Sequence, residues 1–417
     1  MISAENAIRI ILEALPAVRR EAVPVARAPG RTAAEDVASR GDIPPFDNSS
    51  MDGFALRSGD VRAAGSASPV RLTLAGESSA GNPFDRRLRA GAAVRVMTGG
   101  VIPRGADAVV PVEQAEAEGD EAVLIRAPAH AGAYIRRKGE DIPRGRRVIA
   151  RGDLLTPAHA GVLSAVGRDR VRVAVRPLTG ILATGDELVA PHRAPGPGQI
   201  RNSSSTALMG MVNEAGGTPL FLGIARDRKN AIRKKVLEGL ETDLLLLTGG
   251  VSVGARDFVG EVLREAGVKI RFWRVNIRPG SPLLFGTARG TLVFGLPGNP
   301  VSTAVTFLEF VRPAIRGMLG RSALFPSRFT AVTDEALSGD GAKRCYLRGI
   351  ARQEGGTLHV RTTGSQSSGV MTSMLTANCL VILPEGGPPR APGDTVEIEF
   401  LRDPAAGAAT GRGEHDA

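Results

Sequence analysis

The residues best suited to chemistry lie in three glycine-rich turns, each of which follows an apolar, strand-like run. The turns are Thr184-Gly185-Asp186-Glu187, Thr248-Gly249-Gly250 and Pro297-Gly298-Asn299-Pro300. Backbone N–H groups at a glycine turn and at a helix N-terminus favour a bound anion. The hydroxyls of Thr184, Thr248 and Ser252 supply further donors. The pattern therefore predicts a phosphate-rich, nucleotide-like ligand, although each turn alone is also typical of an ordinary tight turn.

Carboxylates lie beside these turns. Glu187 ends the first turn, Asp227 follows the strand-like run 219–223, and Asp257 lies shortly after the second turn. On a parallel sheet all three would share one edge. Acids beside a phosphate-binding loop repel the ligand unless a divalent cation lies between them, so we predict Mg²⁺ held by Asp227 and Asp257. The alternative for each acid is a helix N-cap or a charge in the first helical turn.

An oxyanion site is predicted in the segment FWRVNIRPGSP (272–282). Arg274, Asn276 and Arg278 alternate there, so they would share one face of an extended segment. Guanidinium groups bind tetrahedral oxyanions through paired donors. A solvated strand face is the alternative in a chain with this many arginines.

The elements that must position these turns alternate regularly from Leu178 onwards. We expect strands at 178–183, 219–223, 243–248, 269–275 and 291–296, a hairpin-like segment at 283–285, and helices at 203–215, 228–240, 257–266 and 301–319. This alternation predicts a doubly wound, mostly parallel α/β sheet. Residues 244–247 and 292–296 are apolar throughout, as expected of strands covered on both faces.

The flanking segments follow other patterns. Ser3 is a predicted N-cap of a helix at 3–15, which Pro16 ends, and Thr156 and Pro157 predict the start of a second helix. Between Val23 and about residue 141, short β-prone runs at 70–74, 93–97, 108–112 and 122–125 predict an all-β insertion. Beyond residue 325, strands at 329–333, 346–350, 357–362, 379–383 and 395–400 predict a small barrel or sandwich.

Composition excludes several classes of protein. The net charge is +10, but only six of the 53 basic residues are lysine and no basic run occurs, so no nucleic-acid partner is expected. Two cysteines exclude a disulfide framework and a cysteine-based zinc site. No segment has the length of a membrane span, so we expect a cytoplasmic protein without a membrane partner. No Ser–His–acid or Cys–His pairing supports covalent acyl chemistry, whereas phosphoryl chemistry needs mainly positioning and charge neutralisation.

The predicted β-rich insertion carries three unusual segments. FDNSSMDGFALR (46–57) places Asp52 beside a glycine, MTGG (97–100) contains Thr98, and RRKGED (136–141) ends at Asp141. Each segment on its own is typical of a turn.

Together, these motifs resemble the molybdopterin molybdenumtransferase family, which comprises MoeA-type bacterial enzymes and the E domain of gephyrin. The matching segments follow the family order over nearly the whole chain: DIPPFDNSSMDGFAL, VMTGGVIPRGADAVVPVE, RRKGEDI, TGDEL, GQIRNS, TGGVSVGARDF, GLPGNPVS and GSQSSG. Eight motifs in order make the resemblance far more specific than any single glycine turn.

The resemblance implies a four-part subunit and a homodimer. The parts are a helical linking domain (1–22 and 143–176), a β-rich lid domain (23–142), a molybdopterin-binding α/β domain (177–322) and a C-terminal small β-barrel (323–402). We expect the tail 403–417 to be disordered. The lid would cover the α/β domain of the other subunit, so that the site is completed across the dimer.

The resemblance also implies a reaction. Family enzymes take adenylated molybdopterin and molybdate and, with Mg²⁺, insert molybdenum and release AMP. The molybdopterin adenylyltransferase and recipient molybdoenzymes are further expected partners. The residues that match functional positions of the family are Asp52, Thr98, Asp141, Glu187, Asp227, Asp257, Pro297 and Pro300.

The predicted oxyanion contacts depart from the family pattern. They are Arg274, Arg278, Ser281, Arg348 and Ser367, with Ser368 as an alternative to Ser367. Many relatives carry lysines at the first three positions, so two cations are kept with changed geometry and one is lost at Ser281. This leaves three alternatives open: tungstate selectivity, a pterin-binding paralogue without turnover, and a scaffold protein. The adenylyltransferase itself shares the α/β domain, but it lacks the flanking domains.

Overall fold

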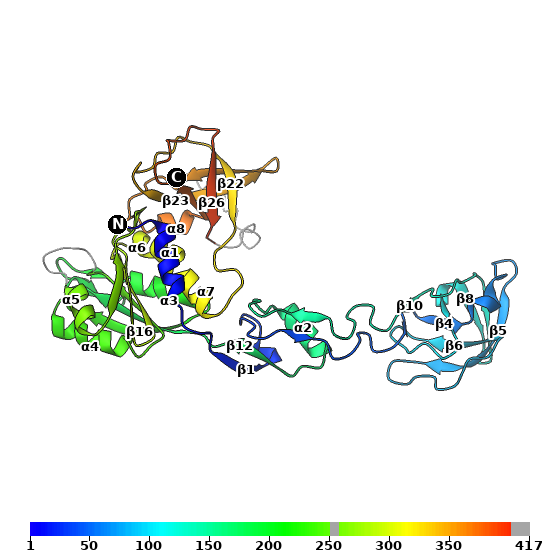
Figure 1. Ribbon diagram of the computed structural model, residues 1–417. Coiled ribbons are helices and arrows are strands. Elements are labelled where there is room, and N and C mark those ends of the chain that lie inside the picture. The colour runs from blue at the N-terminus through cyan, green and yellow to red at the C-terminus, as the bar shows by residue number, and fades with distance from the viewer. Residues whose placement is uncertain (251–257, 402–417) are drawn as a thin grey trace.

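The computed structural model describes residues 1–250 and 258–401 and shows an elongated molecule (Figure 1). An α/β domain and a C-terminal barrel form a body at one end. A small linking domain joins this body to a β-rich lid domain at the far end. The predicted fold class is confirmed.

The α/β domain is built on a six-stranded sheet with the order β16-β13-β17-β21-β20-β18. Its first four strands in that order are parallel to one another, β20 runs antiparallel to β21, and β18 runs antiparallel to β20. The strands are β13 (Leu178–Thr184), β16 (Thr218–Ala225), β17 (Leu244–Thr248), β18 (Lys269–Trp273), β20 (Leu284–Ala288) and β21 (Thr291–Leu296). The sheet is therefore mostly parallel, as predicted, with an antiparallel edge.

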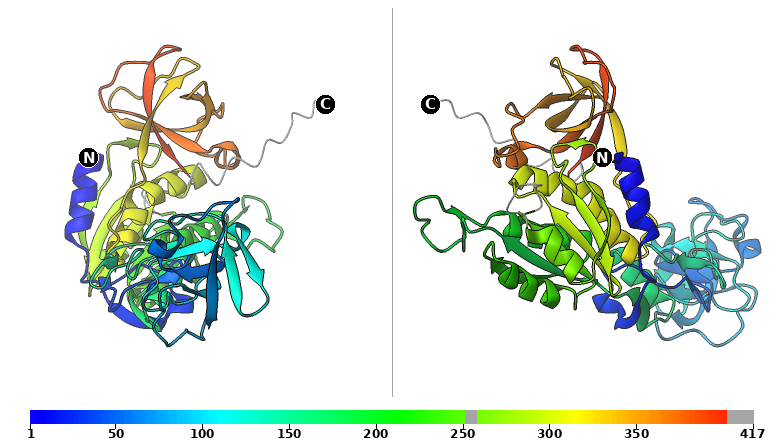
Figure 2. Two further views of the ribbon diagram at one scale, coloured as in Figure 1. Left: turned by 90° about the vertical axis from the view of Figure 1, so that its right-hand side faces the viewer. Right: turned by 60° about the vertical axis from the view of Figure 1, so that its left-hand side comes forward.

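Helices cover both faces of this sheet (Figure 2). The apolar strand β17 alternates between the two resulting cores: Leu244 and Leu246 face one, Leu245 and Leu247 the other. One face is covered by α3 (Ser204–Ala215) and a long helical segment, the other by α4 (Lys229–Gly239) and α5 (Phe258–Glu265). The long segment consists of α6 (Pro300–Thr306), the π-turn η4 (Phe307–Val311) and α7 (Arg312–Met318). It was predicted as one helix, but Pro313 lacks the N–H that a regular α-helix needs there.

The C-terminal domain is a closed five-stranded barrel. Its strands are β22 (Arg328–Thr333), β23 (Arg344–Glu354), β24 (Thr357–Thr362), β25 (Cys379–Leu383) and β26 (Thr395–Phe400), and α8 (Ser373–Thr376) lies before β25. The pairing of β23 with β25 closes the ring. A short strand of the α/β domain, β19 (Ile277–Arg278), pairs with β23 and ties the two domains together.

The linking domain contains α2 (Pro157–Ala165) and two short sheets. Thr156 and Pro157 begin the helix as predicted, and the side chain of Thr156 caps it. The sheets pair β1 (Arg20–Pro24) with β12 (Arg170–Ala174) and β2 (Val37–Ala38) with β11 (Arg147–Ile149). The 3₁₀ turn η1 (Val25–Arg27) packs in the same small core. This turn and β2 therefore lie in the linking domain, although the predicted lid boundary at residue 23 had included them in the lid.

The predicted linking segment 1–22 divides between two domains. Helix α1 (Ala4–Glu13), with Ser3 as its N-cap, is found as predicted, and β1 lies in the linking domain. However, Ala7 and Ile11 of α1 are buried in the core of the α/β domain together with Phe310. The apolar stripe of the helix covers that domain, so the helical part of 1–22 does not belong to the linking domain.

The lid domain is an all-β unit with a six-stranded sheet, as the turn density predicted. The sheet order is β7-β4-β6-β5-β9-β8, with β4 (Gly53–Leu56), β5 (Val70–Ser78), β6 (Ala92–Val96), β7 (Ala108–Pro111), β8 (Ala115–Glu118) and β9 (Ala122–Ile125). Two 3₁₀ turns, η2 (Ser58–Val61) and η3 (Val112–Gln114), lie between strands. The strands β3 (Asn48–Ser49) and β10 (Ile135–Arg136) pair where the chain enters and leaves the lid.

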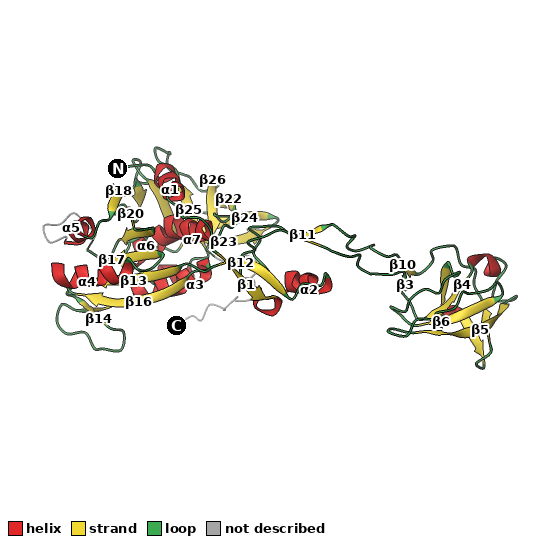
Figure 3. Ribbon diagram, turned by 60° about the horizontal axis from the view of Figure 1, so that its bottom comes forward, coloured by secondary structure: helices red, strands yellow, loops and turns green. Residues whose placement is uncertain are grey.

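Two antiparallel chain segments connect the lid to the linking domain (Figure 3). Ile43 bridges to Ile142, and Asp47 accepts hydrogen bonds from the Arg137 side chain and the Lys138 backbone, at 2.8 Å each. In Figures 1 and 3 this connector holds the lid away from the α/β domain. Within the described residues, no helix is long and apolar enough to cross a membrane.

Candidate active site

The three glycine-rich turns meet at one edge of the α/β sheet. Thr248 at the end of β17 pairs in register with Ala183 of β13 and Leu296 of β21. Because these strands are parallel, the turns after all three emerge side by side at their carboxyl ends. This edge is where the sequence predicted the ligand.

A cavity of about 210 Å³ lies between these turns. It is flanked by the N-terminal ends of α3 and α6 and by β15 (Ile200–Arg201), which pairs with β14 (Leu188–Val189). The lining residues are Thr184, Glu187, Leu188, Ile200, Arg201, Asn202, Ser203, Ser204, Thr248, Gly249, Gly298, Asn299 and Pro300. We call this space the turn cavity. Arg201, Asn202 and Ser204 were missed as single residues, although the GQIRNS motif contained the first two.

The turn at Gly249 packs too closely for a side chain. Gly249 has φ +87°, and a Cβ atom there would lie 2.4 Å from the carbonyl oxygen of Thr184. A Cβ on Gly298 would lie 3.5 Å from the Cα of Gly249, so the two turns are in contact. The backbone itself therefore lines the turn cavity, which suits a bulky anion that needs N–H donors.

One buried hydroxyl at this point has no partner. The Oγ1 atom of Thr184 is buried and has no hydrogen-bond partner among the described residues. The hydroxyls of Thr248 and Thr303, in contrast, both donate to the carbonyl of Pro297. An unpaired buried hydroxyl costs free energy, about 1–3 kcal/mol, unless a ligand accepts its hydrogen bond. Thr184 is therefore a candidate ligand contact.

Two acids face each other at the ends of β13 and β16. Asp227 Oδ2 accepts the backbone N–H of Asp186 at 3.4 Å, and Asp186 Oδ1 accepts that of Asp227 at 3.2 Å. Glu187 lies on the same edge, as predicted, with its carboxylate folded over Gly185. The pairing of Asp186 was missed, because the sequence suggested Glu187 as the acid of this turn. Asp257 and Ser252 lie outside the described residues.

A second and larger cavity, of about 990 Å³, lies between the α/β domain and the barrel. We call it the interdomain cavity. The segment 277–282 forms one wall, and the barrel loops 335–348 and 362–368 form the other. Four predicted oxyanion contacts line it, namely Arg278, Ser281, Arg348 and Ser367. Ser302 and Ser368 also line it, and Ser368 accepts a 2.9 Å hydrogen bond from Asn299 of the turn cavity.

Arg348 brings a buried positive charge to this interdomain cavity. Its side chain is fully buried and donates to Ser373 Oγ and to the carbonyl oxygens of Ser365 and Ser367. Burial lowers the pKa of its guanidinium. Because these acceptors are neutral oxygens, the charge attracts an anion in the adjoining cavity.

Arg274 lies elsewhere. Its φ of +96° ends the extended segment after β18, so the predicted alternation with Asn276 and Arg278 on one face is wrong. Asn276 donates instead to the carbonyl of Ala342 at 2.7 Å. Neither Arg274 nor Asn276 is among the residues that line the interdomain cavity.

Asp52 and Thr98 are neighbours on the lid. Asp52 Oδ1 accepts two hydrogen bonds from Thr98, from its backbone N–H (2.6 Å) and its hydroxyl (2.8 Å). These hydrogen bonds hold the pKa of Asp52 below its usual value, so the exposed acid is ionised. Gly53 is required beside it, because the Val110 carbonyl oxygen occupies the space of a Cβ atom. Asp141 lies separately, exposed on the connector.

Comparison with known proteins agrees with this architecture. Three family models match in order: the MoeA N-terminal region (domains I and II) at residues 2–167, the probable molybdopterin-binding domain at 180–317, and the MoeA C-terminal region (domain IV) at 330–401. The chain therefore belongs to the MoeA family of molybdopterin molybdenumtransferases.

Individual relatives match over nearly their full length. The molybdopterin molybdenumtransferase of Haemophilus influenzae is 33% identical over 403 residues, which cover 96% of this chain and 98% of the relative. The Bacillus subtilis enzyme of that name is 34% identical, with 89% and 88% covered. A crystal structure of the molybdopterin biosynthesis MoeA protein from Pyrococcus horikoshii superposes with a TM-score of 0.82 at 32% identity, covering 97% of this chain and all of that one.

Proposed function

We propose that this protein is a molybdopterin molybdenumtransferase, which inserts molybdate into adenylated molybdopterin and releases AMP. The observation that carries the proposal is the pair of adjoining cavities. The turn cavity presents backbone donors suited to phosphate, and the interdomain cavity presents cations suited to an oxyanion. Asn299 and Pro300 line the turn cavity and Ser302 lines the interdomain cavity, so the two substrates would meet at this segment.

The donors and cations of the two cavities indicate which substrate each cavity would bind. The pyrophosphate of the adenylated pterin would lie on the Gly249–Gly250 turn and accept the hydroxyl hydrogen bond of Thr184. Molybdate would be held by Arg278 and drawn in by the charge of Arg348. Ser281 provides a hydroxyl where many relatives have a lysine, and it donates to the Val275 carbonyl at 3.0 Å.

The acids at this edge fit Mg²⁺ as a shared ion. Asp186 and Asp227 each use one oxygen for a backbone N–H, which leaves the other for a cation. No group of three acidic, histidine or cysteine side chains in the described part of the chain is arranged to hold a metal alone. Mg²⁺ typically binds through one or two carboxylates together with substrate phosphates. When bound, the ion would neutralise phosphate charge. Asp227 with Asp257 remains our proposed ligand pair, and the contacts of the described residues add Asp186 as a further candidate beside Asp227.

The position of the lid residues leads us to propose a second subunit. Asp52 directly precedes β4 and Thr98 follows β6, and both strands lie at the opposite end of the molecule from β16 of the α/β sheet (Figure 1). We propose that the lid of one protomer covers the site of its partner in a homodimer. The exposed apolar residues Met51, Met97 and Tyr134 around Asp52 support a lid that contacts another surface.

AMP release tests the proposed function directly. The full chain is incubated with adenylated molybdopterin, Mg²⁺ and either molybdate or tungstate, and AMP and metal-loaded cofactor are quantified. We expect release with molybdate that depends on Mg²⁺. AMP with tungstate alone would assign a tungstate-selective version of the enzyme. No AMP with either oxyanion would contradict the proposal and favour a binding or scaffold protein.

Replacement of Thr184 by valine distinguishes a role of the Thr184 hydroxyl in ligand binding from a role in stability. Valine keeps the shape of the side chain and removes the unpaired hydroxyl, so the free energy of unfolding should stay equal or rise by about 1 kcal/mol. Affinity for adenylated molybdopterin should fall about tenfold, because one ligand hydrogen bond is lost. Calorimetric titration and thermal unfolding measure the two effects.

Thr303→Val is the matched control for this substitution. Its hydroxyl donates to the carbonyls of Pro297 and Asn299, at 2.6 and 3.0 Å, so its loss should lower stability. If Thr184→Val lowered stability as much and left the affinity unchanged, the hydroxyl of Thr184 would be structural.

A further inference from the structure

The interdomain cavity contains a carboxylate that faces the cavity's own cations. Asp340 Oδ2 lies 3.3 Å from a terminal nitrogen (Nη1) of Arg278 and 3.8 Å from Nζ of Lys343. Arg278 belongs to β19 of the α/β domain, whereas Asp340 and Lys343 lie on the barrel loop before β23. All three residues line the cavity. One acid thus faces two cations in the space that the proposed function assigns to an oxyanion.

Contacts other than this charge pairing hold the loop of Asp340 in place. The backbone N–H of Asp340 donates to Cys345 Sγ at 3.2 Å. Asn276 binds the same loop twice: its side chain donates to the Ala342 carbonyl, and its own carbonyl accepts the N–H of Arg344. The loop would therefore keep its position if the carboxylate lost its charge.

The ion pairs themselves are loose. The Arg278 side chain is 68% exposed. Both nitrogen–oxygen distances exceed the 2.7–2.9 Å typical of a charge-assisted hydrogen bond. Lys343 and Asp340 are 30% and 27% exposed, so both pairs remain in contact with solvent, and long pairs in contact with solvent contribute little to stability. A tetrahedral dianion carries twice the charge of a carboxylate and more acceptor oxygens, so it can replace the carboxylate at both cations.

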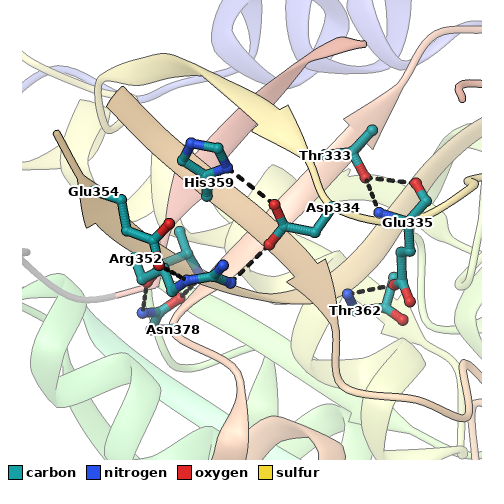
Figure 4. A network of polar contacts seen from close by, with 9 residues as sticks. Thr333, Asp334, Glu335, Arg352, Glu354, His359, Thr362 and Asn378 are labelled. Carbon is teal, nitrogen blue, oxygen red and sulfur yellow. Dashed lines mark hydrogen bonds and ion pairs between the residues drawn. The ribbon is translucent and has the colours of Figure 1, made fainter. Parts of the chain in front are cut away.

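The other charged groups of the cavity do not compete in this way. Glu335, the second acid that lines it, accepts the backbone N–H of Thr362 at 2.6 Å (Figure 4). Arg348 donates to Ser373 and to backbone carbonyls of the loop beside it. Asp340 is thus the acid paired with the cavity-lining cations in the described structure.

We propose that Asp340 is an internal counter-anion, which neutralises Arg278 and Lys343 until an oxyanion displaces it. The inference rests on the proposed function and deepens it in two respects. First, it assigns Lys343 as an oxyanion ligand that supplies a positive charge on the wall of the cavity opposite Ser281. Second, it assigns Asp340 as a residue that weakens oxyanion binding and so raises the oxyanion concentration needed to occupy the cavity.

Tungstate binding to the full chain tests this inference. Binding is measured by calorimetric titration at fixed ionic strength, in a buffer without competing oxyanions, for the natural protein, Asp340→Asn and Lys343→Met. We expect Asp340→Asn to bind tungstate about tenfold more tightly, because the competing charge is gone. Lys343→Met should bind about three- to tenfold more weakly.

A matched control removes an acid elsewhere on the barrel. Asp334 does not line the cavity, and its carboxylate pairs with Arg352 and His359 (Figure 4), so Asp334→Asn should leave the tungstate affinity within about twofold. In an Arg278→Met/Lys343→Met background, Asp340→Asn should tighten binding by a smaller factor, because no cation is left to release and only the direct repulsion between the carboxylate and the oxyanion is removed. Thermal unfolding verifies that each variant is folded.

The direction of the change in tungstate affinity shows whether Asp340 competes with the oxyanion or positions the residues that bind it. If Asp340→Asn bound tungstate equally or more weakly while the natural protein bound it, the counter-anion inference alone would be overturned. If neither protein bound tungstate, both this inference and the assignment of the cavity to an oxyanion would be wrong.

Discussion

A mixed dimer of Asp52→Ala and Asp227→Ala subunits is expected to recover activity that each variant alone has lost. Either substitution removes a charged group from the proposed site, and we expect a loss of about 100-fold or more in AMP release. Asp52 directly precedes β4 of the lid and Asp227 follows β16 of the α/β sheet, and these two strands lie at opposite ends of the molecule (Figures 1 and 3). In a dimer with exchanged lids, one of the two sites of the mixed dimer would then be free of substitutions.

The two arrangements of the same substitutions give opposite results. Subunits with different affinity tags allow the mixed dimers to be purified and assayed for AMP release. The dimer with one substitution in each subunit should keep about half of the natural activity. A dimer of the natural subunit with an Asp52→Ala/Asp227→Ala subunit should be nearly inactive, because each of its sites carries one substitution. The reverse outcome would mean that each lid covers the site of its own chain.

Replacement of Arg312 by methionine is expected to destabilise the junction between the α/β domain and the barrel by about 3–5 kcal/mol. Arg312 and Glu399 form a buried ion pair, with side chains 9% and 3% exposed. Arg312 lies on α7 and Glu399 on β26, so the pair joins the two domains between which the interdomain cavity lies. Without the arginine, Glu399 and the neighbouring Glu309 are two buried carboxylates that lack their principal cation.

Denaturant unfolding measures this loss, and an exposed pair provides the control. Arg352→Met removes a cation from the barrel surface, where Arg352 is 45% exposed beside Asp334. It should cost less than about 1 kcal/mol. If Arg312→Met proved equally mild, the buried pair would not hold the domains together.

The same cluster gives stability a pH dependence. Burial first, and then the charge of Glu399, raise the pKa of Glu309 to about 7. The folded protein therefore binds this proton more tightly than the unfolded chain does, and stability falls as pH rises from about 4.5 through 7. Glu309→Gln should remove this decline and gain on the order of 3 kcal/mol over the natural protein at pH 8. Unfolding midpoints at pH 5 and pH 8 would show it, and parallel pH profiles of the two proteins would contradict it.

Local sequence signals were sufficient for most elements of the fold. The apolar strand β17, the caps Ser3 and Thr156 and the turn-dense lid strands lie where the pattern placed them. These features depend on neighbours within a few residues, so a single sequence contains them. The packing of α1 against the α/β domain depends on distant residues such as Phe310, and an amphipathic stripe does not specify what it covers.

The parts of the site that glycine turns form could be predicted from the sequence. The parts that depend on strand register or on single backbone angles could not. Thr184, Gly249 and the turn at 297–300 line the turn cavity because glycine turns after parallel strands share one edge. The reciprocal bonds of Asp186 and Asp227 depend on the register of two strands. The positive φ of Arg274 arises where the chain passes from one sheet to another, and alternation along the sequence gave no sign of it.

The connector of the lid has an evolutionary consequence. The lid begins and ends at paired residues, since Asn48 lies opposite Arg136 and Ser49 opposite Ile135. A domain whose two ends leave the scaffold side by side can be gained, lost or exchanged in one genetic event without interrupting another element. The lid can therefore diversify as an independent module, while the body that binds the substrates retains its own core.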